Sequence, residues 1–389
     1  MKIKLTVVAT LLLSSLAASP VPMASAALPP PPHPAHKGAP VDTRASGEID
    51  DLISKMTLRE KVGQLVMFSI SGKSLTSAER DAIRANHLGG VILFARNYED
   101  KSQLTALTDQ IQAAVRPSSG IRAGALISVD QEGGVVKRFE DMPPRYSAPR
   151  MGEIGSKAVA LEEGRKTGYA LKQAGVNVNL APVADLDLPP EHVMAARSFG
   201  ANRYAAGRLV KAFGEGMQLK RVAATAKHFP GLGGATQNTD DGRAYVYRSK
   251  NDLRTIDAVP FEKAVKANFQ LMMVSHAMFV NDGGEVPASM SYHISTRRLR
   301  KGFGFEGVAI SDDLGVVAWR FGGSVAKACK NTVKAGVDIA LLAGDHVTAQ
   351  ACASKLYQAV RRDSISERRI DQAVGRVLRL KRWLRLLPG

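Results

Sequence analysis

Apolar and polar positions follow a repeating pattern along the chain. Eight short apolar runs, each typical of a buried strand, are separated by longer stretches in which apolar residues recur at helical spacing. The predicted strands cover residues 62–70, 90–95, 124–130, 176–185, 223–230, 271–276, 307–313 and 338–344. Helices are predicted between them, for example over residues 103–115, 157–174, 203–220, 252–267 and 325–335.

This alternation predicts an α/β fold in which eight parallel strands close into a (β/α)8 TIM barrel. An open doubly wound sheet usually has fewer strands and a glycine-rich phosphate loop after the first one, and no such loop follows residues 62–70. A chain of 389 residues is compatible with one barrel domain. We therefore expect a single catalytic domain over residues 47–389.

The first 46 residues differ in composition from the rest. Lys2 and Lys4 precede an apolar run over residues 5–16, and small residues ending in Ala26 follow it. This order is typical of a cleavable signal peptide over residues 1–26, because the run is too short to span a bilayer. Residues 27–46 are rich in proline and predict an extended linker. The sequence thus predicts an exported bacterial protein, either secreted or associated with the cell wall.

The chain is strongly basic, with a formal net charge of +17. For an exported protein, this charge favours electrostatic association with an anionic cell wall or membrane surface over binding to nucleic acid. Part of the basic excess lies within residues 361–385, where apolar residues form a second face. We expect a final helix that packs on the body of the protein and has a solvated basic side.

The sequence contains two cysteines, Cys329 and Cys352. They are too few and too far apart for a disulfide scaffold or a zinc site. One disulfide would be compatible with an oxidising compartment, but the pattern favours two separately buried thiols. Both cysteines are expected on the helices that follow strands seven and eight.

Polar residues gather at the carboxyl ends of five predicted strands. They are Asp130, Asp185, Lys227 with His228, His276, and Asp312 with Asp313. Active sites of barrels lie at this end, and helix capping has no need for lysine, histidine and carboxylates to converge there. Together with Arg138 and Arg197, such residues suit an uncharged polyol such as a sugar. A metal site is a weaker interpretation, since cations would share the mouth, and we expect no metal and no cofactor.

Seven motifs then identify a family. They are DQEGG at 130–134, KRF at 137–139, LAPVAD at 180–185, ARSFG at 196–200, KHFPG at 227–231, PASMS at 287–291 and GFEGVAISDDL at 304–314. In this order they resemble glycoside hydrolase family 3, and within it the single-domain β-N-acetylglucosaminidases. The resemblance covers most of the chain after residue 46.

The resemblance implies roles for individual residues. Asp312 matches the family's nucleophile, which forms a covalent glycosyl-enzyme in a retaining mechanism. The neighbouring Asp313 is a rival for this role, and the alternative is that it is an N-terminal residue of the next helix. Positions that contact the sugar hydroxyls and the acetamide group match Asp130, Arg138, Arg197, Lys227 and His228.

The chain departs from the family in the loop after KHFPG. The family has an Asp-Ser-His stretch there, whose histidine is the general acid and base, whereas this chain has Asn238, Thr239 and Asp240. Leu232 replaces a further histidine of the same loop. Three alternatives remain: Asp240 is the acid/base, Asp241 or another loop residue takes the role, or the barrel binds glycans with little turnover. We favour Asp240, because a titratable replacement is consistent with retained chemistry.

The resulting hypothesis is an exported hydrolase that removes β-linked N-acetylhexosamine residues, for example N-acetylglucosamine, from cell-wall or related glycans. The alternatives are an activity like that of a β-glucosidase or β-xylosidase and a glycan-binding protein that adheres to the wall. Hydrolysis of an aryl β-N-acetylglucosaminide that is lost in Asp312→Ala would distinguish the enzyme from the binding protein.

Overall fold

The computed structural model describes residues 43–115, 121–284, 286–320 and 323–388. Eight parallel strands form one sheet in the order β11-β9-β7-β6-β3-β2-β1-β12. Their bounds are β1 Val66–Ser69, β2 Gly90–Leu93, β3 Leu126–Val129, β6 Val178–Asn179, β7 Ala223–Phe229, β9 Leu271–Val274, β11 Val308–Ser311 and β12 Ala340–Leu342. A parallel bridge between Ile310 and Ile339 brings β11 next to β12, so the sheet is a nearly closed barrel. The predicted TIM barrel is confirmed.

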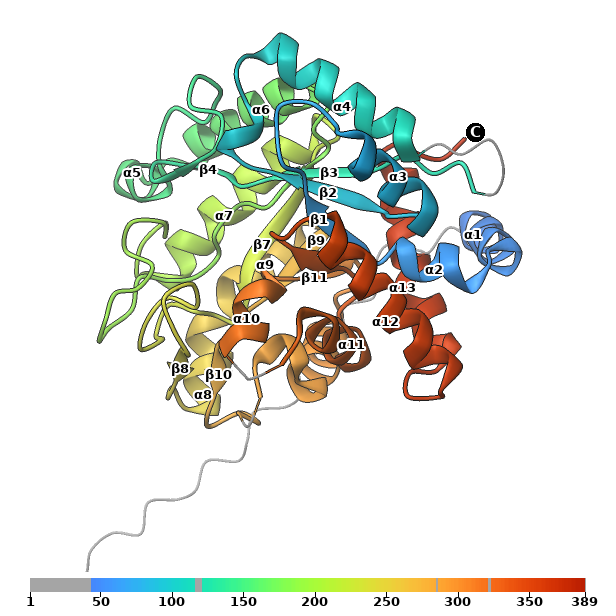
Figure 1. Cartoon of the computed structure of the whole chain (residues 1–389). Helices are drawn as coiled ribbons and strands as arrows, with labels where there is room; N and C mark the ends of the chain where they lie inside the picture. The colour runs from blue at the N-terminus through green and yellow to red at the C-terminus, as the bar shows by residue number, and fades with distance from the viewer. Residues whose placement is uncertain (1–42, 116–120, 285, 321–322, 389) are drawn as a thin grey trace, which may run out of the picture. The chain divides into compact units, whose positions relative to one another are not determined.

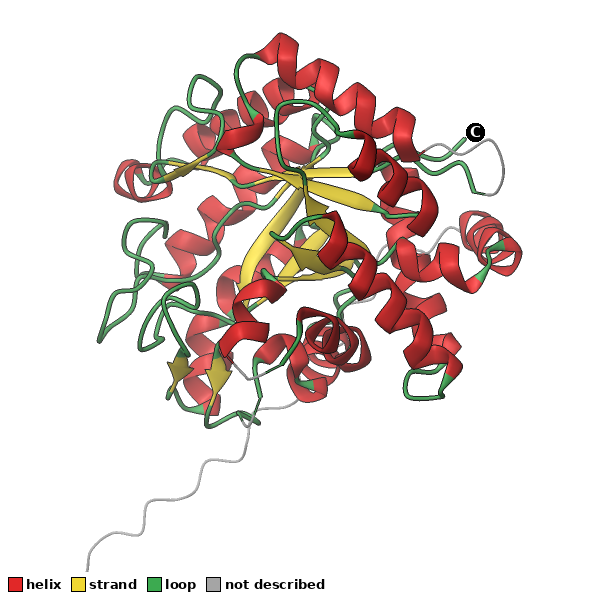
Figure 2. Cartoon of the chain, in the orientation of Figure 1, coloured by secondary structure: helices red, strands yellow, loops and turns green. Residues whose placement is uncertain are grey.

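Helices surround the barrel, as Figures 1 and 2 show. They are α1 Thr43–Lys55, α2 Leu58–Gly63, α3 Ser77–Asn86, α4 Lys101–Val115, α5 Ala148–Ile154, α6 Lys157–Gln173, α7 Arg203–Gln218, α8 Lys250–Asp252, α9 Val259–Lys266, α10 Leu314–Arg320, α11 Val325–Ala335, α12 His346–Arg361 and α13 Glu367–Trp383. Several begin at a residue whose side chain accepts a hydrogen bond from the first turn. Examples are Thr57 before α2, Ser324 before α11 and Ser366 before α13.

Two small sheets extend the barrel at its carboxyl end. β4 (Gln131–Gly133) pairs antiparallel with β5 (Val136–Lys137), and β8 (Tyr245–Val246) pairs in parallel with β10 (Met278–Phe279). Both sheets lie in segments that follow barrel strands β3, β7 and β9 along the chain. They therefore shape the loops in which a barrel enzyme carries its site.

Each predicted strand contains one barrel strand, but the predicted boundaries were too wide. Val62 and Gly63 belong to α2, because Thr57 and Glu60 cap that helix before the first strand begins. The fourth strand is reduced to Val178–Asn179, followed by a bridge from Val183 to Lys227. The helix predicted over residues 252–267 is divided into α8, a π-helical turn over Leu253–Asp257, and α9.

The expectation for the last helix was only partly correct. α13 packs on the body through Ile370, Val374 and Val377, as predicted. Its basic side is not simply solvated, however, because Arg369 and Arg376 form ion pairs with buried Asp338. Lys381 is also buried, and its ammonium group donates hydrogen bonds to Gln64 Oε1 (2.6 Å) and to the carbonyl oxygen of Gly89 (3.0 Å).

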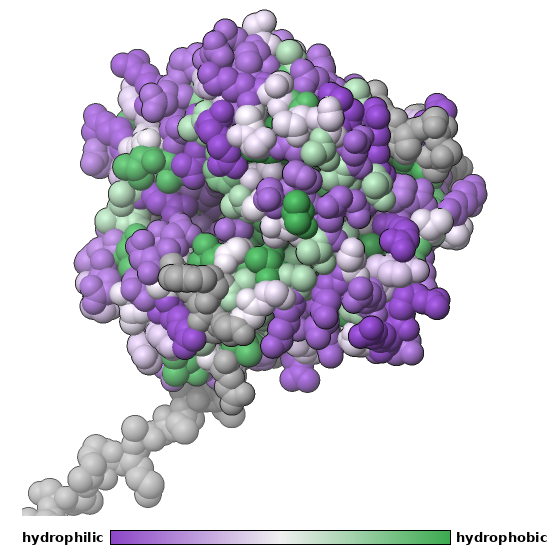
Figure 3. Space-filling view, in the orientation of Figure 1, coloured by the Kyte–Doolittle hydropathy of each residue, from purple (hydrophilic) through white to green (hydrophobic). Residues whose placement is uncertain are grey.

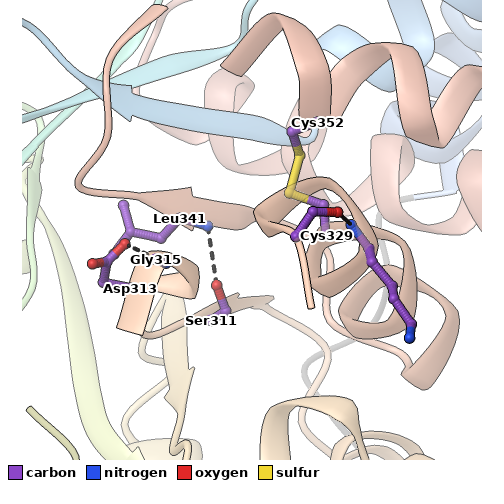
Figure 4. Close-up of a disulfide and its surroundings, with 8 residues drawn as sticks. Ser311, Asp313, Gly315, Cys329, Leu341 and Cys352 are labelled. Atoms are coloured by element: carbon purple, nitrogen blue, oxygen red, sulfur yellow. Dashed lines mark hydrogen bonds between the residues drawn. A yellow bond between two sulfur atoms is a disulfide. The ribbon is translucent and has the colours of Figure 1, made fainter. Parts of the chain in front are cut away.

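The expectation of two separate thiols was wrong. Cys329 on α11 and Cys352 on α12 form a disulfide, with their Cα atoms 5.8 Å apart (Figure 4). The two helices do follow strands seven and eight, and the neighbouring positions of those strands bring the cysteines within bonding range.

The predicted signal peptide lies outside the described residues, as does most of the predicted linker. Among the helices that the structure does describe, none combines the length and the apolar character that crossing a membrane requires.

Candidate active site

A cavity of about 200 Å³ opens where the barrel strands end. All seven predicted site residues line it: Asp130, Arg138, Arg197, Lys227, His228, Asp240 and Asp312. Its volume is below the range of about 300–1,000 Å³ that is common for drug-sized ligands, so it suits one sugar ring better than an extended glycan. The sequence therefore predicted the composition of this cavity well. Figure 3 shows the largely hydrophilic face of the protein in the orientation of Figure 1.

A network of buried charges holds one side of the cavity in place. Lys227, on β7, places its ammonium nitrogen 2.6 Å from Asp130 Oδ1 and 2.7 Å from Glu132 Oε1. Arg197 binds the same Glu132 carboxylate through two hydrogen bonds of 2.7 and 3.0 Å. Arg138 is farther away, with Nη2 at 4.0 Å from Asp130 Oδ2. Asp130 is thus fixed at one oxygen and faces Arg138 with the other.

Glu132 is a member of this network that sequence reasoning missed. Burial opposes ionisation of its carboxyl group, but the positive charges of Lys227 and Arg197 outweigh burial and lower its pKa to about 2. In the sequence, the signal for Glu132 is its position two residues after Asp130 in the DQEGG motif. In the structure, this position lies in β4. That spacing alone does not reveal that two cations converge on the glutamate.

Asp312 follows the last residue of β11 and lines the cavity. Its Oδ1 accepts a hydrogen bond of 2.9 Å from the N–H group of Asp313, and its Oδ2 lies 4.0 Å from His228 Nε2. Burial raises the pKa of Asp312, but interactions with His228 and His276 and with the Asp313 N–H group have the larger combined effect and lower it. The lowered pKa favours the ionised form of the Asp312 carboxyl group.

Asp313 has a different environment. Its Oδ1 accepts hydrogen bonds from the N–H groups of Gly315 (3.0 Å) and Ala343 (2.8 Å). It thus caps the start of α10 and ties β11 to the segment after β12. This geometry matches the helix-terminal role considered for Asp313.

His228 is held from behind by Asp185. The Asp185 Oδ2 atom lies 2.7 Å from His228 Nδ1 and accepts a hydrogen bond of 3.0 Å from the His228 backbone N–H. The other oxygen of Asp185 accepts a hydrogen bond from the backbone N–H group of Leu232 (2.6 Å). Asp185 therefore fixes the imidazole and the start of the following loop with one carboxylate.

That loop is a hairpin whose tip carries Asp240. Its shaft is formed by a bridge between Ala235 and Val246 and by a hydrogen bond of 3.0 Å from the Thr236 N–H to the Tyr245 carbonyl oxygen. Asn238 and Asp240 line the cavity, whereas Asp241 is not among its lining residues. The structure thus brings Asp240, rather than its neighbour Asp241, to the site.

The Asp240 carboxyl group stays partly in contact with solvent. Partial burial and the negative charge of Asp312 nevertheless raise its pKa above the ordinary value. Two carboxyl groups with pKa values shifted in opposite directions are the arrangement in which one acts as an anion and the other as an acid.

The remaining wall is apolar, with Ile92, Phe94, Leu180, Met273 and Leu341 among its residues. The Arg138 guanidinium lies over the Phe94 ring, 5.7 Å from its centroid. This contact holds Arg138 between the apolar wall and Asp130.

Comparisons with known proteins show the family of this chain. Residues 57–380 match the model of the glycosyl hydrolase family 3 N-terminal domain. A β-hexosaminidase of Nitrosomonas eutropha is 32% identical over 335 residues, which are 83% of this chain and 93% of that protein.

Two solved structures are also similar. A family 3 β-N-acetylglucosaminidase from Paenibacillus sp. str. FPU-7 has a TM-score of 0.81 at 32% identity, covering 86% of this chain and 64% of that one. A β-N-acetylhexosaminidase from Beutenbergia cavernae has a TM-score of 0.78 at 29% identity, covering 84% of this chain and 98% of that one. With its barrel, its cavity and this match, the chain is an enzyme that belongs to glycoside hydrolase family 3.

Proposed function

We propose that the enzyme removes β-linked N-acetylhexosamine residues, such as N-acetylglucosamine, with retention of configuration. The observation that carries this proposal is the pairing of Asp312 and Asp240 in one cavity, with the pKa of the first lowered and that of the second raised. The names of the relatives, β-hexosaminidase and β-N-acetylglucosaminidase, support the choice of sugar.

In the first step, a carboxylate oxygen of Asp312 attacks the anomeric carbon, and the bond from that carbon to the leaving oxygen breaks. The protonated carboxyl group of Asp240 gives its proton to the leaving oxygen. The product is a glycosyl ester on Asp312. In the second step, the Asp240 carboxylate removes a proton from water, the water oxygen bonds to the anomeric carbon, and Asp312 leaves as a carboxylate.

The other charged groups of the cavity suit binding of the sugar hydroxyl and acetamide groups. Asp130 can accept a hydroxyl hydrogen with the oxygen that Lys227 does not hold, and Arg138 and His228 can donate to sugar oxygens. Because Lys227 and Arg197 are already bound to carboxylates, their main effect is to hold Asp130 and Glu132 in place and to lower the pKa of Glu132.

We further propose that the enzyme is exported and acts on cell-wall or related glycans. The signal-peptide pattern of residues 1–26 supports export. The disulfide between Cys329 and Cys352 supports it independently, because such bonds persist mainly in oxidising compartments.

The test is hydrolysis of three aryl β-glycosides, carrying N-acetylglucosamine, glucose or xylose, by the wild type and by Asp312→Ala. We expect turnover of the N-acetylglucosaminide at a kcat/KM at least about tenfold above the other two, and loss of that turnover in the variant. A preference for glucose or xylose would refute the proposed substrate. Retained turnover by Asp312→Ala would refute the proposed nucleophile.

A further inference from the structure

A second cavity, of about 600 Å³, lies at the other end of the barrel. It is lined by residues that precede β9 and β11, including Phe269, Phe305 and Glu306, and by the end of α9 and one side of α13. The amino ends of these strands point away from the catalytic mouth. This groove is therefore separate from the site described above, although it is the larger of the two cavities.

Three cations line the groove: Lys266 on α9, and Arg376 and Arg379 on α13. Glu306 is the one acidic residue among its lining residues. Within the part of the chain that the structure describes, the side chains of Lys266 and Arg379 form no hydrogen bond and no ion pair. Lys266 thus has no ion-pair partner, and the charge of Arg379 is offset only by longer-range interactions with Asp50, Asp338 and Glu306.

Arg376 is only partly compensated. Its Nη1 atom lies 3.2 Å from Asp338 Oδ1, but the same buried carboxylate also forms ion pairs with Arg300 and Arg369. The single negative charge of Asp338 is thus shared by three guanidinium groups. Burial and the neighbouring Arg376 charge also lower the pKa of Arg379, and nearby acidic groups offset this effect only in part. An added anion would stabilise the positive charges at this position.

An aromatic side chain lies beside these cations. Trp383 lines the groove at the end of α13, and Arg221 holds it from outside through a hydrogen bond of 3.1 Å to the Trp383 carbonyl oxygen. The Arg221 guanidinium also lies 5.3 Å from the Trp383 ring centroid. A fixed indole ring can pack against the carbon atoms of a polyol, while arginine and lysine bind phosphate oxygens.

We propose that this groove is a second, non-catalytic site that binds a linear anionic polymer whose backbone alternates phosphate and polyol groups. A chain-like ligand fits a concave groove, whereas the flat surface of a bilayer would not reach its floor. Because the groove and the catalytic mouth lie at different ends of the barrel, a bound polymer would leave the mouth open to its glycan. The inference does not depend on the proposed hydrolysis.

The test uses the whole protein and a fluorescently labelled poly(glycerol phosphate) chain, with affinity measured by anisotropy over a range of salt concentrations. The variant Lys266→Glu/Arg379→Glu reverses the two groove charges that have no ion-pair partner. The control Lys101→Glu/Lys327→Glu changes the net charge equally at exposed positions on α4 and α11.

We expect the groove variant to bind the polymer about tenfold more weakly or worse, with a salt dependence reduced by about 0.7 in log–log slope for each lost contact. The control should stay within about twofold of the wild type, and both variants should keep the wild-type rate on an aryl glycoside. Lys266→Gln/Arg379→Gln should give a smaller loss in the same direction, which provides a second test if charge reversal prevents folding.

Equal loss in the groove and control variants would contradict the proposal, because binding would then follow net charge alone. Undiminished binding by both groove variants would contradict it as well. Inorganic phosphate could also compete as strongly as unlabelled polymer at equal phosphate concentration. That result would contradict the proposal, because the groove would then bind a free anion and not a polymer. Tighter binding to phosphatidylglycerol vesicles than to the polymer would assign the surface to a membrane instead.

Discussion

Asp312 and Asp240 differ in pKa because they have different surroundings. Asp312 is stabilised as an anion by nearby His228 and by the Asp313 N–H group, whereas Asp240 at the loop tip faces the Asp312 charge. Ionised Asp312 and protonated Asp240 therefore coexist over the range of pH between their two pKa values. We expect kcat/KM to fall above this range as Asp240 loses its proton, and below it as Asp312 gains one.

Replacing Asp240 with asparagine tests its role directly. Without a proton donor, hydrolysis of a substrate with a poor leaving group should fall by about 10²- to 10⁴-fold, whereas an activated aryl leaving group should be affected less in the first step. Added azide should accept the glycosyl group from Asp312 and restore part of the rate. The matched control is Asp241→Asn, next to Asp240 but outside the cavity lining, which should keep near-wild-type activity. An unimpaired Asp240→Asn variant would remove Asp240 from catalysis.

The charge of Asp240 also bears on which acceptor resolves the glycosyl-enzyme. An ionised Asp240 repels an incoming phosphate, by roughly 4 kcal/mol for unit charges 4 Å apart at an effective dielectric constant of 20. We therefore expect hydrolysis without phosphorolysis, measured as the absence of sugar 1-phosphate in phosphate buffer. Rapid formation of that product by the wild type would show that this repulsion does not operate.

Glu132 provides a test of the buried network. In Glu132→Gln, Lys227 and Arg197 lose a negative charge that both of them contact. The NH2 group of the new amide must also face one of these cations, because both carboxylate oxygens of Glu132 contact them. We expect unfolding to require about 3 kcal/mol less free energy, together with a higher KM for the aryl glycoside. Urea denaturation and initial rates measure the two effects. An unchanged free energy of unfolding and an unchanged KM would mean that the Glu132 charge does not stabilise this network.

At the scale of elements, the sequence predicts the order and type of the barrel units but not their limits. The spacing of apolar residues predicts the bounds of β7 and α11 closely, because burial in β7 and the capped start of α11 agree with the local sequence pattern. It fails near Val62, where a capped helix buries the same kind of residue as a strand. It also fails to show that Arg369 and Arg376 turn inward, since their partner Asp338 lies more than 30 residues away.

The disulfide joins α11 and α12 beside the seam of the barrel. β11 and β12 meet there through the Ile310–Ile339 bridge and a hydrogen bond of 3.0 Å from the Leu341 N–H to Ser311 Oγ (Figure 4). Asp312 therefore follows a strand at this seam. The bond closes a loop with a sequence separation of 23 residues, and its removal should lower the free energy of unfolding by about 3 kcal/mol.

The double variant Cys329→Ala/Cys352→Ala tests this value by urea denaturation, compared with oxidised wild type. A thiol assay of denatured, unreduced wild type should detect no free thiol, because both cysteines of the sequence are in the bond. Two free thiols, with equal stability of variant and wild type, would contradict the disulfide.

At the scale of the whole molecule, Lys381 couples folding to pH. Burial lowers the pKa of this lysine to about 7, although Gln64 and Gly89 accept its hydrogen bonds. An unfolded lysine keeps its proton to a pH of about 10.4, so between pH 7 and pH 10 the unfolded state binds more protons and the stability should rise with pH.

The expected gain is about 2 kcal/mol between pH 7 and pH 9, measured as the difference between wild type and Lys381→Met. Below pH 7 the difference should be constant, since both states then carry the charge. Exposed Lys101→Met is the control and should follow the wild type at every pH. A pH-independent difference for Lys381→Met would show that the buried amine keeps an ordinary pKa.

The central claim is that a covalent bond forms between the sugar and Asp312. The most direct measurement is peptide mass spectrometry after reaction with a 5-fluoro-N-acetylglucosaminyl fluoride, which forms the glycosyl-enzyme faster than the ester breaks down. We expect one added sugar on the peptide that contains Asp312, with fragmentation that assigns it to this aspartate and not to Asp313. A sugar attached to another carboxylate, or active enzyme with no adduct and an inverted product, would contradict it.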